Sequence, residues 1–274
     1  MDEPTSVLTP QEVESLFITL NALVKEGRTI LYITHKLEEV ITLCNEVTIM
    51  RNGEVIDSCS TENQTAKSLA TKMLGERLDE LQTDYTHIND FINFKASKIS
   101  CSFADPFFTD LKNISFEVKE GEIFGIAGVA GNGQSELMDI LIGENCTIDS
   151  GEIIFKKTNI ESFNPQKRRD LSIAFVPENR LGHSAVPELT LSENILLSQF
   201  PNNNFSNHGI LNNNFIEDYA KEVINNFNVV TPGSDAKASS LSGGNLQKFV
   251  IGREISSNPK LLIISHPTWG IDAG

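Results

Sequence analysis

The sequence contains no long hydrophobic run, few cysteines and fewer basic than acidic residues. No apolar stretch reaches the roughly 18 residues of a membrane-spanning helix, so we expect none. The first residues lack the basic and apolar segments of a signal peptide. The four cysteines lie far apart without a CxxC pair, which disfavours a disulfide framework or a zinc site and is typical of reduced thiols. Lys and Arg number 22 against 37 Asp and Glu, and the net charge of −15 argues against binding nucleic acid through a basic surface.

What is present is the composition of a soluble globular protein, with 39% hydrophobic and 22% charged residues. Short β-rich apolar runs alternate with segments of helical periodicity, which predicts an α/β fold with a mainly parallel sheet. We expect helices at residues 10–26, 36–44, 65–74, 134–143 and 244–257. We expect strands at residues 29–34, 114–118, 122–127, 173–176 and 261–264, and a hairpin over residues 47–58.

The most specific motif is a glycine-rich loop between the expected strand 122–127 and the helix that follows it. Glycines in this setting let successive backbone N–H groups and a helix N-terminus face a phosphate. The loop matches the pattern GxxxxGK[ST], except that glutamine stands where lysine is expected. Because that lysine is missing, a tight turn that needs glycine for packing alone is the alternative. The candidate phosphate-binding residues are Gly128, Gly131, Asn132, Gly133, Gln134 and Ser135.

A second motif, the run Leu241 to Lys248, lies just upstream of the expected strand 261–264. Its small residues head a helix, so they build a further N-terminus that can face an anion. A Ser-Gly-Gly run by itself is a commonplace loop, but its position after a phosphate-loop-like turn and before a buried strand favours a function. The candidate binding residues in this motif are Ser242, Gly243, Gly244 and Gln247.

In this order the motifs resemble those of the ATP-binding subunit of an ATP-binding-cassette (ABC) transporter. The likeness is greatest to the tandem-cassette ATPases of bacterial simple-sugar and nucleoside importers, and it covers essentially the whole chain. Residues 128–135 resemble the Walker A loop of the second cassette, and residues 241–247 its signature motif. Residues 261–268 resemble its Walker B strand, residues 269–272 its D-loop and residues 176–180 its Q-loop. This combination of motifs and spacings is highly specific.

The resemblance implies an α/β fold of the P-loop NTPase type, with a mainly parallel core sheet, an antiparallel β subdomain and a helical subdomain. Residues 1–75 would be the C-terminal remnant of a first cassette, and residues 76–92 a linker. Residues 93–274 would form a second cassette that lacks its C-terminal end, with the helical subdomain at about residues 178–240. The chain thus looks like one full period of a duplicated module, incomplete at both ends.

The N-terminal segment then resembles the end of the first cassette's Walker B motif, its D-loop and its switch histidine. By the family's mechanism, Asp2 would hold Mg²⁺ through water, Glu3 would polarise the attacking water and His35 would contact the γ-phosphate of ATP. Without the resemblance, Asp2 and Glu3 are simply charges at a chain end, and His35 merely ends a strand. Neither composite ATP site is complete within one copy, so we expect the chain alone to be inactive.

The second cassette departs from a working ATPase at several positions. An offset of 263 residues aligns Ser265 and His266 with the N-terminal acidic pair, so they stand where aspartate and glutamate are expected. Gln134 supplies no positive charge for the phosphates, and Glu178 occupies the Q-loop glutamine position. Ser135 keeps a hydroxyl that can bind Mg²⁺. We therefore expect this loop to bind nucleotide weakly and not to hydrolyse it.

The resemblance indicates a fragment of an importer subunit that uses ATP and Mg²⁺ and works with transmembrane permease subunits and a substrate-binding protein. It would lie at the cytoplasmic face of the bacterial inner membrane, with residues 179–193 against the permease. The alternative is a non-catalytic remnant that binds nucleotide or docks on a permease. The acidic balance disfavours a cassette of the DNA-repair or ribosome-associated kind. Phe103, Phe107 and Phe108 are candidates to stack on adenine, and for Phe107 and Phe108 a place in the core is the alternative.

Overall fold

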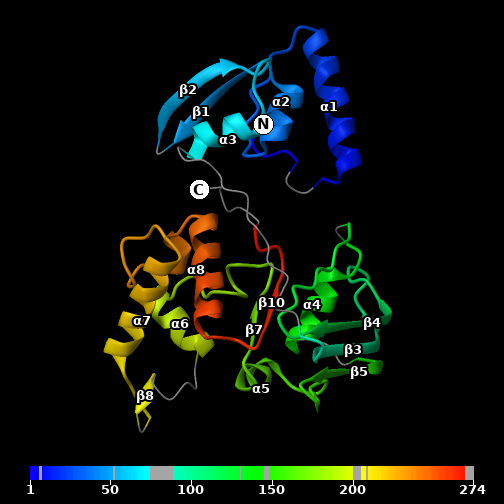
Figure 1. Cartoon of the computed structure of the whole chain (residues 1–274), viewed down its shortest axis with the longest axis vertical. Helices are drawn as coiled ribbons and strands as arrows, with labels where there is room; N and C mark the ends of the chain where they lie inside the picture. The colour runs from blue at the N-terminus through cyan, green and yellow to red at the C-terminus, as the bar shows by residue number, and fades with distance from the viewer. Residues whose placement is uncertain are drawn as a thin grey trace. The chain divides into compact units, whose positions relative to one another are not determined.

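The computed structural model describes residues 1–5, 8–51, 53–74, 89–129, 131–144, 148–199, 205–207 and 209–268. The chain divides into two compact units, unit 1 within residues 1–85 and unit 2 within residues 86–271 (Figure 1). Among the helices in the described ranges, none combines the length and the apolar character that crossing a bilayer requires.

Unit 1 packs helices and a hairpin around a small apolar core. Its elements are α1 (Pro10–Lys25), α2 (Leu37–Leu43), β1 (Glu46–Arg51), β2 (Glu54–Ser60) and α3 (Ala66–Leu74). Helix α1 opens on a capping box, in which Thr9 and Glu12 each accept a hydrogen bond from the backbone N–H of the other. β1 and β2 pair antiparallel, so the predicted hairpin is confirmed. Val40 of α2, Ile49 of β1 and Leu69 of α3 are buried together and form the core.

The strand predicted at residues 29–34 is wrong. One isolated parallel bridge, between Asp2 and Ile33, joins this segment to the first residues of the chain. The bridge consists of two backbone hydrogen bonds of 2.9 Å, from the Ile33 N–H to the Met1 carbonyl and from the Glu3 N–H to the Ile33 carbonyl. An apolar run becomes a strand where neighbouring strands take up its backbone groups. In the described part of unit 1, residues 1–3 alone pair with this segment, and Leu31 is 76% exposed.

Unit 2 contains an antiparallel sheet and a parallel pair of strands (Figure 1). Its first elements are β3 (Ile92–Cys101), β4 (Leu111–Lys119), α4 (Gln134–Ile142), β5 (Ser150–Phe155), β6 (Thr158–Asn159), α5 (Pro165–Asp170) and β7 (Ile173–Val176), and its last is β10 (Leu261–Ile264). The sheet order is β4-β3-β5-β6, and all neighbours are antiparallel. β7 and β10 pair parallel, with Leu261 opposite Ile173, so both predicted strands are confirmed. The strand predicted at residues 114–118 lies within β4 and is also confirmed.

The strand predicted at residues 122–127 is wrong, although a strand is expected immediately before a phosphate loop. Residues 122–129 have no regular secondary structure. The side chains of Ile123 and Ile126 are 97% and 48% exposed. The two parallel strands that the structure describes, β7 and β10, pair with each other and leave this segment without a neighbour. Apolar alternation indicates that a segment can join a sheet, but the sheet must supply the partner.

The rest of unit 2 is mainly helical. Its elements are α6 (Leu191–Gln199), β8 (Ser206–Asn207), β9 (Ile210–Leu211), α7 (Asn213–Asn226), a 3₁₀ turn (Ala238–Ser240) and α8 (Gly243–Ser256). Leu191, Ile195, Ala220, Leu246 and Phe249 are each at most 2% exposed and belong to one apolar cluster. This cluster joins α6, α7 and α8, and it fixes the helix that carries the second motif at its N-terminus.

Candidate functional site

The glycine-rich loop lies immediately before α4, as the motif predicts. Gly131 and Gly133 have φ angles of +83° and +100°, a left-handed region that favours glycine. A Cβ added to Gly133 would lie 2.7 Å from a methyl carbon of Leu111, so a larger residue does not fit there. Among the residues that the structure describes, no side chain caps the N-terminus of α4. Its first N–H groups are therefore free of a competing side chain, as anion binding requires.

The side chain of Gln134 lies across this loop. Its amide nitrogen donates to the Val129 carbonyl at 3.2 Å, and the side-chain amide of Asn132 donates to the same carbonyl at 3.0 Å. A Cβ on Gly128 would lie 2.3 Å from the Gln134 amide nitrogen, so only glycine admits this arrangement. The loop thus contains hydrogen-bond donors from both side chains, but the Gln134 amide adds no positive charge.

Three residues singled out from the sequence meet beside the loop: Ser135, Glu178 and His266. The Ser135 hydroxyl donates to Oε2 of Glu178 at 3.4 Å, and Nε2 of His266 lies 4.0 Å from the same oxygen. They converge because Glu178 and His266 follow the parallel neighbours β7 and β10. A carboxylate at this point repels phosphate groups, whereas a hydroxyl and a carboxylate together offer oxygen ligands to Mg²⁺.

The second motif begins α8. The Ser242 hydroxyl accepts from the backbone N–H of Asn245 at 3.4 Å and from its side-chain amide at 2.9 Å, as expected of an N-cap serine. A Cβ on Gly243 would lie 2.6 Å from Nη1 of Arg180, so the Arg180 side chain lies against the start of the helix. Gly244 follows within the first turn.

Gln247 lies in the interior of unit 2. It is 2% exposed, and its side-chain amide donates to the Pro267 carbonyl at 3.4 Å. Its side-chain oxygen is buried without a hydrogen-bond partner in the described structure. This contact ties α8 to the segment after β10, and a role of Gln247 in binding a ligand stays a prediction.

In unit 1 the structure brings Glu3 and His35 together. Nδ1 of His35 lies 2.6 Å from Oε1 of Glu3, and the two side chains are 34% and 42% exposed. The pairing follows from the bridge between Asp2 and Ile33, because each partner comes directly or shortly after a bridged residue. The Asp2 residue is exposed. A histidine in contact with a carboxylate can hold or pass a proton, which is the chemistry that activation of water requires.

Glu3 and His266 share an uncommon backbone conformation. Their φ angles are +41° and +48°, a region that residues with side chains rarely adopt. The two positions are 263 residues apart, which is the offset predicted for the duplicated module. They share this backbone conformation although their side chains differ, and the duplication itself stays a prediction.

The aromatic candidates lie on a segment tied to the glycine loop. The rings of Phe103 and Phe108 stack with their centroids 5.4 Å apart and their planes 19° apart. Phe107 is 94% exposed, so of the two alternatives for this residue the core is excluded. The hydroxyl of Thr109 donates to the Gly131 carbonyl at 2.9 Å. An exposed ring on this segment offers a stacking surface for a planar ligand, and stacking on adenine stays a prediction.

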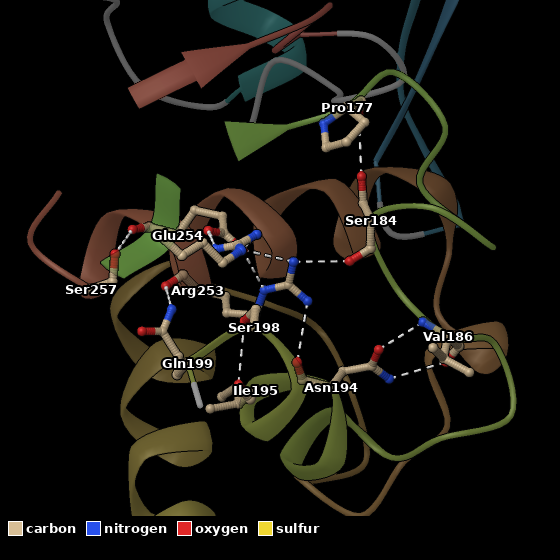
Figure 2. A network of polar contacts seen from close by, with 11 residues as sticks. Pro177, Ser184, Val186, Asn194, Ile195, Ser198, Gln199, Arg253, Glu254 and Ser257 are labelled. Carbon is tan, nitrogen blue, oxygen red and sulfur yellow. Dashed lines mark hydrogen bonds and ion pairs between the residues drawn. The ribbon is translucent and has the colours of Figure 1, made fainter. Parts of the chain in front are cut away.

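A buried ion-pair network around Arg253 and Glu254 holds α8 in place, and no sequence motif pointed to it (Figure 2). Glu254 is 0% exposed, and its carboxylate contacts Arg253 at 2.8 Å and Arg169 of α5 at 2.7 Å. The Arg253 guanidinium also donates to the carbonyls of Asn194 and Ser184, at 3.3 and 2.9 Å. Burial lowers the pKa of Arg253, and the charge of Glu254 opposes that change. One carboxylate therefore supports two arginines.

This network borders a cavity of about 150 Å³ in unit 2. His183, one of the lining residues, pairs with Glu144 across 2.6 Å. Other lining residues are Pro177, Ser184, Val186, Asn194, Leu197 and Arg253. The available sequence signal was an adjacent Arg-Glu pair within the otherwise apolar run from Phe249 to Ile255. A charged pair flanked by apolar residues on both sides indicates burial with partners.

The chain matches the family model described as ABC transporter over residues 111–269, more than half of its length. It is 38% identical to the nucleoside import ATP-binding protein NupA of Lactococcus lactis subsp. cremoris and 37% identical to the guanosine import ATP-binding protein NupO of Bacillus subtilis. It is 35% identical to the ribose import ATP-binding protein RbsA of Bacillus subtilis. These alignments cover 100% of this chain and 53–54% of each relative, so the chain spans about half the length of the curated relatives it matches.

Solved cassettes share the fold. A post-hydrolysis dimer of the ATP-binding cassette MJ0796 bound to ADP and Pi gives a TM-score of 0.55 at 24% identity, over 66% of this chain and 76% of that chain. Another dimeric structure of MJ0796, a bacterial ABC transporter cassette, gives 0.56 with the same coverage. The predicted P-loop NTPase fold of ABC cassettes is thereby confirmed. On the family match and the aligned relatives together, this chain belongs to the ABC transporter family.

Proposed function

We propose that this chain is part of the ATP-binding subunit of a bacterial importer, which couples ATP binding and hydrolysis to uptake of a simple sugar or a nucleoside. The Glu3–His35 contact of 2.6 Å carries the proposal, because it pairs an acid with a histidine as a hydrolytic site needs. The relatives named for import of nucleosides, guanosine and ribose support this substrate class. In this proposal residues 1–75 belong to a first cassette, residues 76–92 link it, and residues 93–274 belong to a second.

In a complete subunit, Glu3 would orient the attacking water by accepting its hydrogen bond. Because the Glu3 carboxylate can only accept, Nδ1 of His35 donates to it, and Nε2 can also donate to the γ-phosphate when the ring carries both protons as an imidazolium. Asp2 would hold Mg²⁺ through water. Mg²⁺, when bound, supplies positive charge that offsets the charge of the phosphate oxygens. The chain's own contribution is thus to orient a water and to hold a proton donor beside it.

The test is ATP hydrolysis by the native protein that contains these residues, isolated together with its permease. We expect hydrolysis in the wild type and its loss in Glu3→Gln, which keeps the shape of the side chain but removes its charge. Glu14→Gln, an exposed change on α1 of the same unit, is the matched control and should retain activity. Unchanged hydrolysis in Glu3→Gln would contradict the proposed role of this residue.

We also propose that the glycine loop of unit 2 binds Mg²⁺–ATP weakly and does not hydrolyse it. The glycine backbone and the uncapped N-terminus of α4 fit a phosphate, and the Ser135 hydroxyl fits Mg²⁺. Against tight binding, the Gln134 amide is neutral and the Glu178 carboxylate lies 3.4 Å from the Ser135 hydroxyl. Hydrolysis of ATP at this loop is disfavoured because His266 places an imidazole where a carboxylic acid would orient the attacking water.

Ser135→Ala is expected to weaken Mg²⁺–ATP binding to the chain by about two- to tenfold, since one hydrogen-bonding group contributes roughly 0.5–1.5 kcal/mol. Isothermal titration calorimetry measures the change, and a parallel phosphate-release assay should show no turnover by either protein. Ser15→Ala removes a hydroxyl in unit 1 and should leave binding unchanged. ATP turnover by the wild-type chain that is lost in Ser135→Ala would contradict the proposal that this loop does not hydrolyse ATP.

A second candidate function is a non-catalytic remnant that binds nucleotide or docks on a permease without turning ATP over. The chemistry at Gln134, Glu178 and His266 favours it, because this loop lacks both the cation and the acid of a working site. The two functions separate in the assay with the permease: hydrolysis that depends on Glu3 supports the ATPase, and its absence from the wild-type complex supports the remnant.

The proposed partners are transmembrane permease subunits and a substrate-binding protein, at the cytoplasmic face of the bacterial inner membrane. The cavity beside Arg253 supports a permease contact, because His183, Ser184 and Val186 line it and fall within the stretch 179–193 expected at that interface. A partner segment could seat there against a rigid wall, since the ion pairs around Glu254 fix α8.

A further inference from the structure

We infer that Glu39 is a positioning residue for the Glu3–His35 pair, acting by tying together the segments on either side of that pair. The inference rests on the proposed function, in which the pair takes part in ATP hydrolysis. Glu39 lies on α2 and is 8% exposed, so its carboxylate is buried, whereas the Glu3–His35 pair is partly exposed.

The Glu39 carboxylate receives groups from three parts of unit 1. The hydroxyl of Thr5 donates to Oε1 at 2.7 Å, and the hydroxyl of Tyr32 donates to Oε2 at 2.7 Å. Nζ of Lys36 lies 3.4 Å from Oε1. The Lys36 ammonium also donates to the carbonyl and the hydroxyl of Thr5, at 3.0 and 3.2 Å. Both carboxylate oxygens are thus partnered, as a buried charge requires.

These contacts bracket the candidate catalytic pair in sequence. Thr5 comes two residues after Glu3, and Lys36 directly follows His35. Thr5 is 1% exposed, so its position is set by the interior and not by solvent. Burial and the hydrogen bond to Glu39 raise the pKa of Tyr32 to about 12, which keeps the phenol a donor at neutral pH. One buried carboxylate therefore fixes the chain beside each member of the pair.

The Glu3–His35 contact needs such support. Ion pairs with solvent access are weak, and both of these side chains are more than a third exposed. In the described part of unit 1, the backbone around them is held by the parallel bridge between Asp2 and Ile33 and by the contact of the Met1 ammonium with the Leu31 carbonyl. A side chain that must meet a reacting group needs its neighbours locked by packing and hydrogen bonds, which Glu39 supplies here.

The test uses the whole chain with ¹⁵N-labelled histidine. The Nδ1 signal of His35 is identified by its disappearance in His35→Gln. Its chemical shift reports the hydrogen bond to Glu3, and Glu3→Gln gives the reference chemical shift in the absence of that carboxylate. In Glu39→Gln we expect the Nδ1 signal to move at least half of the way to its Glu3→Gln position. Glu38→Gln is the matched control, an exposed residue on the same helix, and should leave the signal in place.

Two changes at Thr5 separate positioning from a general loss of structure. Thr5→Val removes the hydroxyl at nearly constant shape and should move the His35 signal in the same direction, whereas Thr5→Ser keeps a hydroxyl and should restore it. An unmoved signal in both Glu39→Gln and Thr5→Val overturns the inference. A signal that moves equally in Glu38→Gln or Thr5→Ser also overturns it, because unit 1 would then be loosening as a whole. The readout needs no ATP turnover, so it fails independently of the proposed function.

Discussion

Replacing Glu254 with alanine is expected to destabilise unit 2 by about 3–5 kcal/mol, the usual result of removing one partner from a buried ion pair. Glu254 is 0% exposed and Arg253 is 3% exposed. Water therefore cannot take the place of the lost carboxylate, and the Arg253 charge stays buried without a counter-ion. Arg169, whose side chain is 18% exposed, loses its 2.7 Å contact at the same time. The two carbonyls that accept from Arg253 satisfy two of its N–H groups but do not balance its charge.

Urea unfolding followed by circular dichroism measures this loss, and amide hydrogen exchange along α8 assigns it to unit 2. Glu254→Gln retains the shape and an acceptor, so it should destabilise less than alanine does. Glu188→Ala removes a carboxylate from an exposed position and should change the free energy of unfolding little. Equal free energies of unfolding for wild type and Glu254→Ala would mean that the network does not hold the helix.

Replacing Gln134 with lysine is expected to tighten binding of Mg²⁺–ATP to the glycine loop about 10- to 100-fold. The Gln134 amide lies within the loop, 3.2 Å from the Val129 carbonyl, so an ammonium group at this position would meet the phosphates. A hydrogen bond to a charged group contributes roughly 1.5–3 kcal/mol, which converts to that range of affinity. The new charge also offsets the carboxylate of Glu178.

Calorimetric titration of the variant with Mg²⁺–ATP and Mg²⁺–ADP gives the affinity gain. Gln166→Lys adds the same charge at an exposed position on α5 and controls for a general electrostatic effect. We expect no ATP turnover in Gln134→Lys, because His266 still stands where an acid is needed. An affinity equal to that of the wild-type chain would show that this loop does not bind the phosphates.

The glycine loop and the parallel strands could be predicted because their signals are local. The positive φ angles of Gly131 and Gly133 require glycine at these positions. β7 and β10 are short apolar runs that pair with each other. Residues 29–34 and 122–127 carry equally good strand patterns, but a strand also needs a neighbour, and no local pattern says whether one is present. The strand predictions failed at these two segments because strand formation depends on a neighbouring strand as well as on the segment's own residues.

The partners of Glu254 could not be predicted for a different reason, although the apolar residues around the Arg253–Glu254 pair indicate its burial. A charge on a helix is usually solvated, so Arg253 and Glu254 give no signal of function individually. Their partner Arg169 lies 85 residues from Glu254 in sequence, and only the fold brings the two together. The Glu39 contacts are similar, since Thr5 is 34 residues away and no spacing rule relates it to a helix that begins after His35.

The left-handed backbone shared by Glu3 and His266 bears on what a substitution at residue 266 would require. Such a conformation is costly for a residue with a side chain and persists where the surrounding chain imposes it. In unit 2 the conformation occurs at His266, whose side chain is an imidazole and not a carboxylate. The main chain there already has a φ angle close to that of Glu3, so placing a carboxylate at residue 266 would require a change of side chain and not of backbone.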